Sequence, residues 1–169
     1  MIFTNGPLVF PDEIRERLEL VVENGKITDV RQETGTRGEK VVDLEGNYLA
    51  PGFVDLHVHG AVGRDTMEAS AEAFRAVCDY HASGGTTSLL LTTASAPLDA
   101  IVDVLKTARD CRSSVRQIAG VHVEGPFLAK TKRGAQREDF ICEPNPGSVA
   151  RLLEFAEAIK RITLAPELP

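Results

Sequence analysis

The sequence predicts an α/β fold that contains the first four β/α units of a (β/α)₈, or TIM-type, barrel after a small β region. After Pro51 the hydrophobic pattern alternates between strands and helices, and such alternation predicts a parallel sheet. Two expected strands end in potential ligand side chains just before a glycine, and parallel barrels place their chemistry at the carboxyl ends of strands. A closed barrel needs eight strands and about 250 residues, so we expect about half a barrel in this chain.

Composition and charge exclude several classes of function. The 169 residues include 25 acidic and 19 basic side chains, a formal net charge of -6. The chain therefore lacks the excess of positive charge that is typical of proteins that bind nucleic acid or an anionic membrane surface. No apolar run approaches the roughly 20 residues of a membrane span, and the N-terminus lacks the pattern of a signal peptide. The cysteines are odd in number and show no CxxC spacing, so neither a disulfide framework nor a thiolate zinc site is indicated. We therefore expect a cytoplasmic protein.

Residues 1–52 form the expected β region of short antiparallel strands. Strands over 18–23 and 26–30 flank Asn24-Gly25, a strong signal for a type I′ hairpin turn. A loop is expected over 31–40, and further strands over 41–44 and 48–50. Pro51-Gly52 marks the expected boundary between this region and the main domain.

The main domain, residues 53–169, follows as strand–helix units. We expect strands over 53–58, 86–93, 117–124 and 161–165, and helices over 70–83, from Pro97 through 108, and over 145–159. Apolar residues at helical spacing predict the buried stripes Phe74, Val77, Cys78 and His81, then Ile101, Val104, Leu105 and Ala108, then Val149, Leu152, Leu153, Ala156 and Ile159. Gly84-Gly85 closes the first helix, and Asn145 and Pro146 open the third as N-cap and N1.

Two strand ends carry residue types that bind metal ions. Side chains alternate along a strand, so Asp55, His57 and His59 share one face, while Val54, Leu56 and Val58 share the face expected to pack under helices. Likewise, His122 and Glu124 share one face of the strand over 117–124. Polar strand ends that face one interior are costly without a partner, and a divalent cation provides one.

Nitrogen and carboxylate ligands without thiolates suit zinc, iron, manganese or cobalt, and their spacing does not choose among these metals. Such an ion lowers the pKa of bound water and polarises a carbonyl, which is the chemistry of metal-assisted hydrolysis. A lone HxH is more often incidental than a ligand pair, and Asp55, Gly60 and the second strand supply the context here. His122 is either a ligand or a structural histidine behind the ligands. His81, on a helical stripe, is expected in the core or at its edge.

A long irregular segment, 126–143, follows the second ligand strand and carries Lys130, Lys132, Arg133 and Arg137. Loops of this length in a compact domain are usually functional or mobile. The basic side chains are either a solvated surface or, beside a metal site, an attraction for an anionic substrate.

The runs PGFVDLHVHGAVGRD, GVHVEGPFLAKTKRGAQ and ITLAPE resemble the N-acetylglucosamine-6-phosphate deacetylases of the amidohydrolase superfamily. The resemblance covers nearly the whole chain, and it implies that residues 1–52 are a β-sandwich segment and that residues 53–169 are the first half of a metal-dependent barrel. It further implies hydrolysis of N-acetylglucosamine 6-phosphate to glucosamine 6-phosphate and acetate, in amino-sugar catabolism, with one or two divalent ions.

The same resemblance assigns roles to individual residues. Glu124 matches the principal metal ligand, and His57 and His59 match the pair that holds a second metal in binuclear members. Ala135 and Gln136 match the segment that contacts the substrate, although many relatives have histidine at position 136. Two further metal-binding histidines and the aspartate that serves as general base and acid are expected beyond Pro169. We therefore expect no catalytic residue within this chain and no activity from the chain alone.

Two other interpretations remain open. One is a different metal-dependent amidohydrolase, dihydroorotase-like or dipeptidase-like, against which GPF after Glu124 and the RGAQ run argue. The other is a non-catalytic fragment that self-associates, because an open half-barrel leaves edge strands and apolar faces uncovered. The strands over 53–58 and 162–165 would be those edges, and we expect a homo-oligomer, a dimer or larger.

Overall fold

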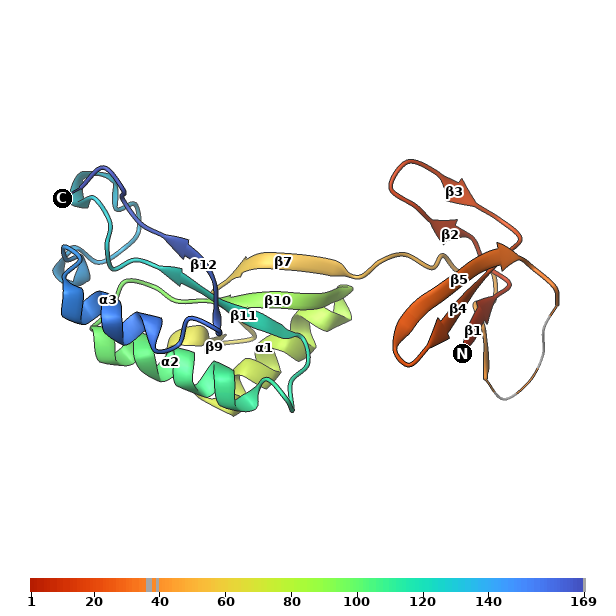
Figure 1. Cartoon of the computed structure of the whole chain (residues 1–169), viewed down its shortest axis with the longest axis horizontal. Helices are drawn as coiled ribbons and strands as arrows, with labels where there is room; N and C mark the ends of the chain where they lie inside the picture. The colour runs from red at the N-terminus through yellow and green to blue at the C-terminus, as the bar shows by residue number, and fades with distance from the viewer. Residues whose placement is uncertain (36–37, 39, 169) are drawn as a thin grey trace. The chain divides into compact units, whose positions relative to one another are not determined.

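The computed structural model describes residues 1–35, 38 and 40–168, and the chain divides into two compact units, Met1–Pro51 and Gly52–Pro169 (Figure 1). The first unit contains a four-stranded sheet with the order β5-β4-β1-β6. β4 (Leu18–Glu23) and β5 (Lys26–Gln32) form the expected hairpin. Asn24 and Gly25 between them have φ values of 51° and 75°, and the positive φ at both positions confirms the type I′ turn.

The other strands of this unit depart from the antiparallel expectation. They are β1 (Ile2–Thr4), β2 (Leu8–Val9), β3 (Ile14–Arg15) and β6 (Val41–Asp43). β1 pairs antiparallel with β4 but parallel with β6, so the expectation of antiparallel strands alone is wrong. The strand expected over 48–50 is reduced to one bridge between Leu8 and Leu49.

β5 continues two residues into the segment expected to be a loop. Glu19 on β4 is fully buried, and a buried carboxylate requires polar partners. The Nε atom of Arg31 lies 3.2 Å from its Oε2 atom, and Thr34 donates to the same carboxylate. These contacts keep the chain paired with β4 as far as Gln32. Residues 36, 37 and 39 of the expected loop lie outside the described residues.

The second unit is built on a parallel four-stranded sheet with the order β12-β11-β10-β7, so β7 and β12 are its edges, as expected. Its strands are β7 (Phe53–Val58), β10 (Thr86–Thr92), β11 (Ile118–Glu124) and β12 (Ile159–Thr163). Its helices, α1 (Ala71–Ser83), α2 (Leu98–Cys111) and α3 (Pro146–Leu153), all lie on one face of the sheet (Figure 1). Short elements are β8 (Gly60–Ala61), β9 (Arg64–Asp65), η1 (Thr66–Glu68), η2 (Lys130–Lys132) and η3 (Glu138–Phe140).

The main core lies between this sheet and its helices. The stripes expected on the first two helices are buried, except at His81, which is only half-buried and lies at the edge. They pack against alternate residues of β10 and β11, namely Leu89, Leu91, Val121 and Val123. The Ser70 hydroxyl accepts from the Ala73 amide at 3.1 Å and starts α1, and a capping box of Asn145 and Ser148 starts α3.

The end of α3 differs from the expectation. The helix ends at Leu153 instead of 159, Leu153 is 61% exposed, and Ala156 lies in the turn that follows. Ile159 already belongs to β12, where it pairs with Val121, so this strand begins two residues earlier than expected. Of the expected apolar face, Leu152 is in the core and Val149 and Ile159 pack against it, and Phe155, just after the helix, joins the core as well. Strand pairing with β11 therefore outweighs the helical apolar pattern.

The apolar face of β7 is only partly covered. Val58 is 4% exposed and belongs to the core, whereas Val54 is 63% and Leu56 is 51% exposed. Within the sheet, α1 packs mainly on β10 and α2 mainly on β11, and β7 is not a main partner of any described helix. The expectation that all three residues pack under helices therefore holds for Val58 alone.

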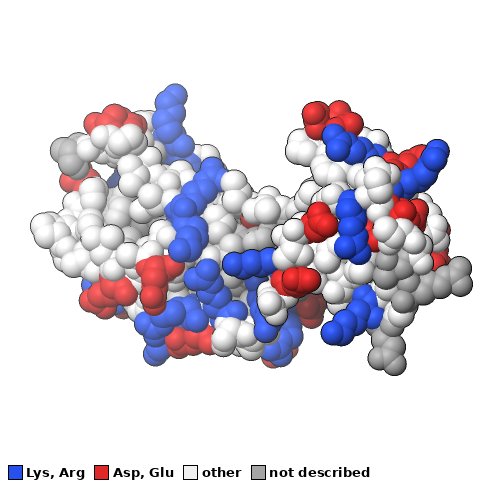
Figure 2. Space-filling model, turned by 45° about the vertical axis from the view of Figure 1, so that its right-hand side comes forward, with Lys and Arg blue, Asp and Glu red and all other residues white. Residues whose placement is uncertain are grey.

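An apolar groove of about 390 Å³ lies between α3 and the segment after β12. Its lining includes Val149, Leu152, Leu153, Ile162, Leu164 and Leu168. Figure 2 shows acidic and basic side chains on both units and an uncharged area near the C-terminal segment of the second unit. Within the described residues, no helix has both the length and the apolar composition needed to cross a membrane.

The three cysteines are free thiols in two different environments. Cys78 and Cys111 are buried as expected, and burial raises the pKa of Cys78 to about 11 and also raises the pKa of Cys111. Cys142 is exposed, and its amide donates to the Pro126 carbonyl at 3.2 Å, which closes the base of the loop over 126–143.

We expect Phe74→Ala to lower the free energy of unfolding by about 3–5 kcal/mol, because Phe74 is fully buried and its removal leaves a cavity. Tyr80→Ala, at an exposed aromatic of the same helix, is the matched control and should cost less than about 1 kcal/mol. Urea unfolding followed by circular dichroism measures both. Equal losses in the two variants would contradict the assignment of the core.

Candidate metal centre

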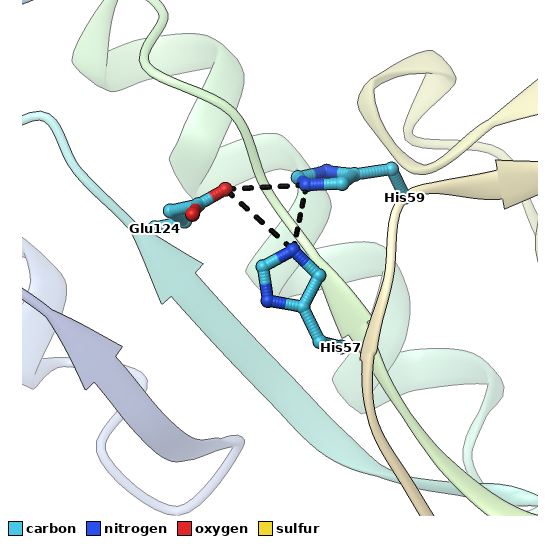
Figure 3. A group of neighbouring side chains, drawn as sticks. All are labelled: His57, His59 and Glu124. Carbon is cyan, nitrogen blue, oxygen red and sulfur yellow. Dashed lines mark hydrogen bonds and ion pairs between the residues drawn. The ribbon is translucent and has the colours of Figure 1, made fainter. Parts of the chain in front are cut away.

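Three side chains from two strands converge at the carboxyl edge of the parallel sheet (Figure 3). His57 lies near the end of β7, His59 follows that strand directly, and Glu124 is the last residue of β11. β10 lies between these two strands, so parallel pairing brings their ends to the same edge. The Glu124 side chain is 20% exposed and the two imidazoles are more open, so the cluster is accessible to solvent.

The ligand atoms are close enough to share one ion. Oε2 of Glu124 lies 3.1 Å from Nε2 of His59 and 3.9 Å from Nε2 of His57, and the two Nε2 atoms are 3.0 Å apart. Two imidazole nitrogens and a carboxylate oxygen are a donor set that divalent transition metals prefer. Three protein ligands leave further coordination positions for water or substrate, as catalytic metal sites do. The residues present therefore fit a divalent ion.

Backbone contacts orient the candidate ligands. Nδ1 of His59 lies 3.2 Å from the Thr92 carbonyl oxygen, which only accepts, so Nδ1 carries the proton and Nε2 keeps its lone pair for a metal. A carboxylate oxygen of Asp55 accepts from the His57 amide at 3.0 Å, and Asp55 is not among the residues whose ligand atoms converge.

Two threonines at the end of β10 fix both ligand strands. The Thr92 hydroxyl accepts from the Val58 amide at 2.9 Å, and the Thr93 hydroxyl accepts from the Glu124 amide at 3.1 Å. Both threonines are fully buried. Neither threonine was expected from the sequence to take part in the site. The sequence feature that could have pointed to them is a pair of hydroxyl residues at the end of the strand that lies between the two ligand strands.

His122 lies behind the cluster. It is fully buried, and its Nε2 atom is 2.7 Å from the Thr163 hydroxyl of β12. Burial, followed by the charge of Arg161, lowers the pKa of His122 to about 4, so it is neutral at pH 7. Its ring centroid is 5.0 Å from that of His57, and it is not among the three residues whose ligand atoms converge. The geometry favours the structural interpretation of His122.

The loop over 126–143 brings Ala135 and Gln136 to the cluster. Nε2 of Gln136 donates to Oε2 of Glu124 at 2.9 Å, and its Oε1 accepts from the Ser95 amide at 2.6 Å. Ala135 is exposed, and with Gln136, Ser95, His59 and others it lines a hollow of about 290 Å³ beside the candidate ligands. Ser95, like the two threonines, was not singled out from the sequence.

The basic residues of this loop are partly neutralised within the loop. Nε of Arg133 is 3.3 Å from an oxygen of Glu138, and a guanidinium nitrogen of Arg137 is 3.3 Å from an oxygen of Asp139. Arg137 also lies over the Phe140 ring. This local pair favours the solvated-surface interpretation for Arg133, whereas Arg137 also lines the hollow beside the candidate ligands.

Comparisons with known proteins agree with this architecture. A protein of Lysinibacillus sphaericus named N-acetylglucosamine-6-phosphate deacetylase is 34% identical over 176 residues, covering 100% of this chain and 45% of the relative. A crystal structure of the Pasteurella multocida deacetylase superposes with a TM-score of 0.89 at 31% identity, covering 99% of this chain and 45% of that one. A mutant of the Mycobacterium smegmatis deacetylase, in complex with N-acetyl-D-glucosamine-6-phosphate, superposes with a TM-score of 0.82 at 25% identity, covering 99% and 44%.

The chain thus spans less than half the length of these relatives. A model described as the amidohydrolase family matches residues 48–169, which include both ligand strands and the loop that carries Gln136. Because this match covers most of the chain, the chain belongs to the amidohydrolase family.

Proposed function

We propose that His57, His59 and Glu124 bind a divalent metal and that this chain supplies the corresponding part of a deacetylase acting on N-acetylglucosamine 6-phosphate. The observation that carries the proposal is the convergence of the three ligand atoms within 4.8 Å of one another. The similarity along the whole chain to proteins named N-acetylglucosamine-6-phosphate deacetylase supports the choice of substrate.

A metal bound here would supply a water of lowered pKa and polarisation of an amide carbonyl. Zinc, iron, manganese and cobalt all suit the donor set, in one or two ions. The chain's own residues bind and orient: the Thr92 carbonyl fixes the tautomer of His59, and the Thr93 hydroxyl fixes the backbone of Glu124. We propose that Ala135 and Gln136 form the substrate side of the hollow next to this cluster.

We also propose a finer architecture, in which Gly52–Pro169 is the first four β/α units of a TIM-type barrel and Met1–Pro51 is a β-sandwich segment. Two features support the barrel. The strands are neighbours in their sequence order. Val58 and Val123, which alternate with His57 and Glu124, belong to the core under the helices, so the ligand side chains lie on the opposite face. All three residues of the cluster are assigned as metal ligands, which leaves none of them as a general acid or base, so we propose that residues 1–169 alone do not turn over substrate.

A self-associating chain is supported by the edges of the sheet. Val54 and Leu56 on β7 and Ile162 on β12 are exposed aliphatic residues on the two edge strands. β7 carries Asp55, whereas β12 carries Lys160 and Arg161, so the two edges have opposite charges. We propose that the β7 edge of one copy pairs with the β12 edge of another to form a homo-oligomer.

Metal content tests the proposed ligands. Purified chain that has been incubated with zinc and desalted should retain about one ion per chain, measured by plasma mass spectrometry, because three ligands hold one ion well. The double variant His57→Ala, Glu124→Ala should lose that ion. Glu143→Ala, at an exposed glutamate of the neighbouring loop, is the control and should retain it. Retention by the double variant would refute the assigned ligands.

Binding of N-acetylglucosamine 6-phosphate tests the proposed substrate. N-acetylglucosamine 6-phosphate should shift the amide resonances of Ala135 and Gln136 in the zinc-loaded chain, because both residues line the hollow beside the cluster. Dihydroorotate, the substrate type of the alternative amidohydrolase, should leave them in place. The reverse pattern would favour that alternative. Acetate release from the same mixture should stay at background, and release that is abolished by Glu124→Ala would contradict the proposed lack of turnover.

The oligomeric state tests the proposed pairing of the sheet edges. Sedimentation velocity at micromolar concentration should show a dimer or larger species. Leu56→Lys should shift it toward monomer, because it places a charge on the exposed edge strand. Ile27→Lys, at an exposed aliphatic residue of β5, is the matched control and should leave the distribution unchanged. A monomeric wild-type chain would rule out self-association.

A further inference from the structure

We propose that Gln136 is a positioning residue that aims the Glu124 carboxylate at the two histidines and thereby couples the loop over 126–143 to metal binding. The inference rests on the proposed metal site and adds a role for a side chain outside the ligand group. Its basis is a bridge of two hydrogen bonds, from the Ser95 amide to Oε1 of Gln136 and from Nε2 of Gln136 to Oε2 of Glu124.

The chemistry of both partners fixes the orientation of the Gln136 amide. A backbone N–H only donates, so Ser95 requires the oxygen end of the amide. An ionised carboxylate only accepts, so Glu124 requires the nitrogen end. Both requirements are met together at 2.6 Å and 2.9 Å, and a flipped amide would lose both bonds. This bridge therefore needs a side chain with one donor and one acceptor at its tip.

The bridged oxygen is the one that faces the candidate metal position. Oε2 of Glu124 accepts from Gln136 and is also the carboxylate oxygen nearest to His57 and His59. A carboxylate oxygen has lone pairs for both a hydrogen bond and a metal, so the bond to Gln136 is compatible with metal binding. The Thr93 hydroxyl already holds the Glu124 backbone, which leaves the side-chain torsions for Gln136 to restrict.

Gln136 also joins segments that are distant in sequence. Ser95 follows β10. Within the described part of the chain its buried hydroxyl has no hydrogen-bond partner. The hydrogen bond from Ser95 to Gln136 is therefore made by the Ser95 amide alone. The ends of the loop are held separately, by the bond from the Cys142 amide to the Pro126 carbonyl. Gln136 thus ties the middle of the loop to the cluster. If the tie raises metal affinity, metal must stabilise the closed loop by the same factor.

The test compares zinc binding and amide exchange in the full chain with those of two variants. Gln136→Leu removes both hydrogen bonds at similar size, and Gln136→Asn keeps the amide but is one methylene too short to reach both partners. The controls are Gln32→Leu, at an exposed glutamine of β5, and Thr131→Val, at an exposed position of the same loop. Zinc affinity is measured by competition with a chromophoric chelator, and exchange by NMR.

We expect both Gln136 variants to bind zinc about 10–100-fold more weakly, the range for loss of a group that orients a ligand. In the absence of metal, the Ser95 amide should exchange faster in both Gln136 variants than in the wild type. Zinc should slow exchange over 126–143 in the wild type but not in the variants. Unchanged zinc affinity and an unchanged loop response in folded variants would overturn the positioning role. Absence of zinc binding by the wild type would instead overturn the proposed metal centre, and this inference with it.

Discussion

Parallel pairing of β10 with β7 on one side and β11 on the other is the constraint on which the candidate site depends. Strands that run in the same direction end at the same edge, so His57, His59 and Glu124 meet although they are distant in sequence. Thr92 and Thr93 strengthen this arrangement, because their hydroxyls accept from backbone amides of the two outer strands. A slip of one residue in either pairing would turn the ligand side chains toward the helices and abolish the cluster.

The two faces of this sheet have separate tasks. Toward the helices, Leu89, Leu91, Val121 and Val123 make the apolar contacts that stabilise the unit. Toward the other face, the alternate positions carry His57, His122 and Glu124. Burial costs little for the first set and much for the second unless polar partners are supplied. The Thr163 hydroxyl contacts His122, and the Gln136 amide donates to Glu124.

Local sequence patterns were enough to predict the hairpin at Asn24-Gly25, the stripes of α1 and α2 apart from His81, and the two ligand strands, because these features depend on neighbours in sequence. The bonds made by Thr92, Thr93 and Gln136 join separate elements, and no local pattern reports them. The same limit explains the wrong end of α3, since pairing of Ile159 with Val121 is a contact between distant segments. Similarly, β5 is extended by the burial of Glu19 on another strand.

The environments of the three cysteines have a practical consequence. Thiolates, not thiols, react with alkylating reagents, and the buried Cys78 and Cys111 have raised pKa values that keep them protonated at neutral pH. Cys142 is exposed at the base of the loop that carries Gln136. A maleimide dye or nitroxide spin label would therefore attach at this one position of the unmutated chain. The loop thus has a built-in attachment point for a spectroscopic reporter of its movements.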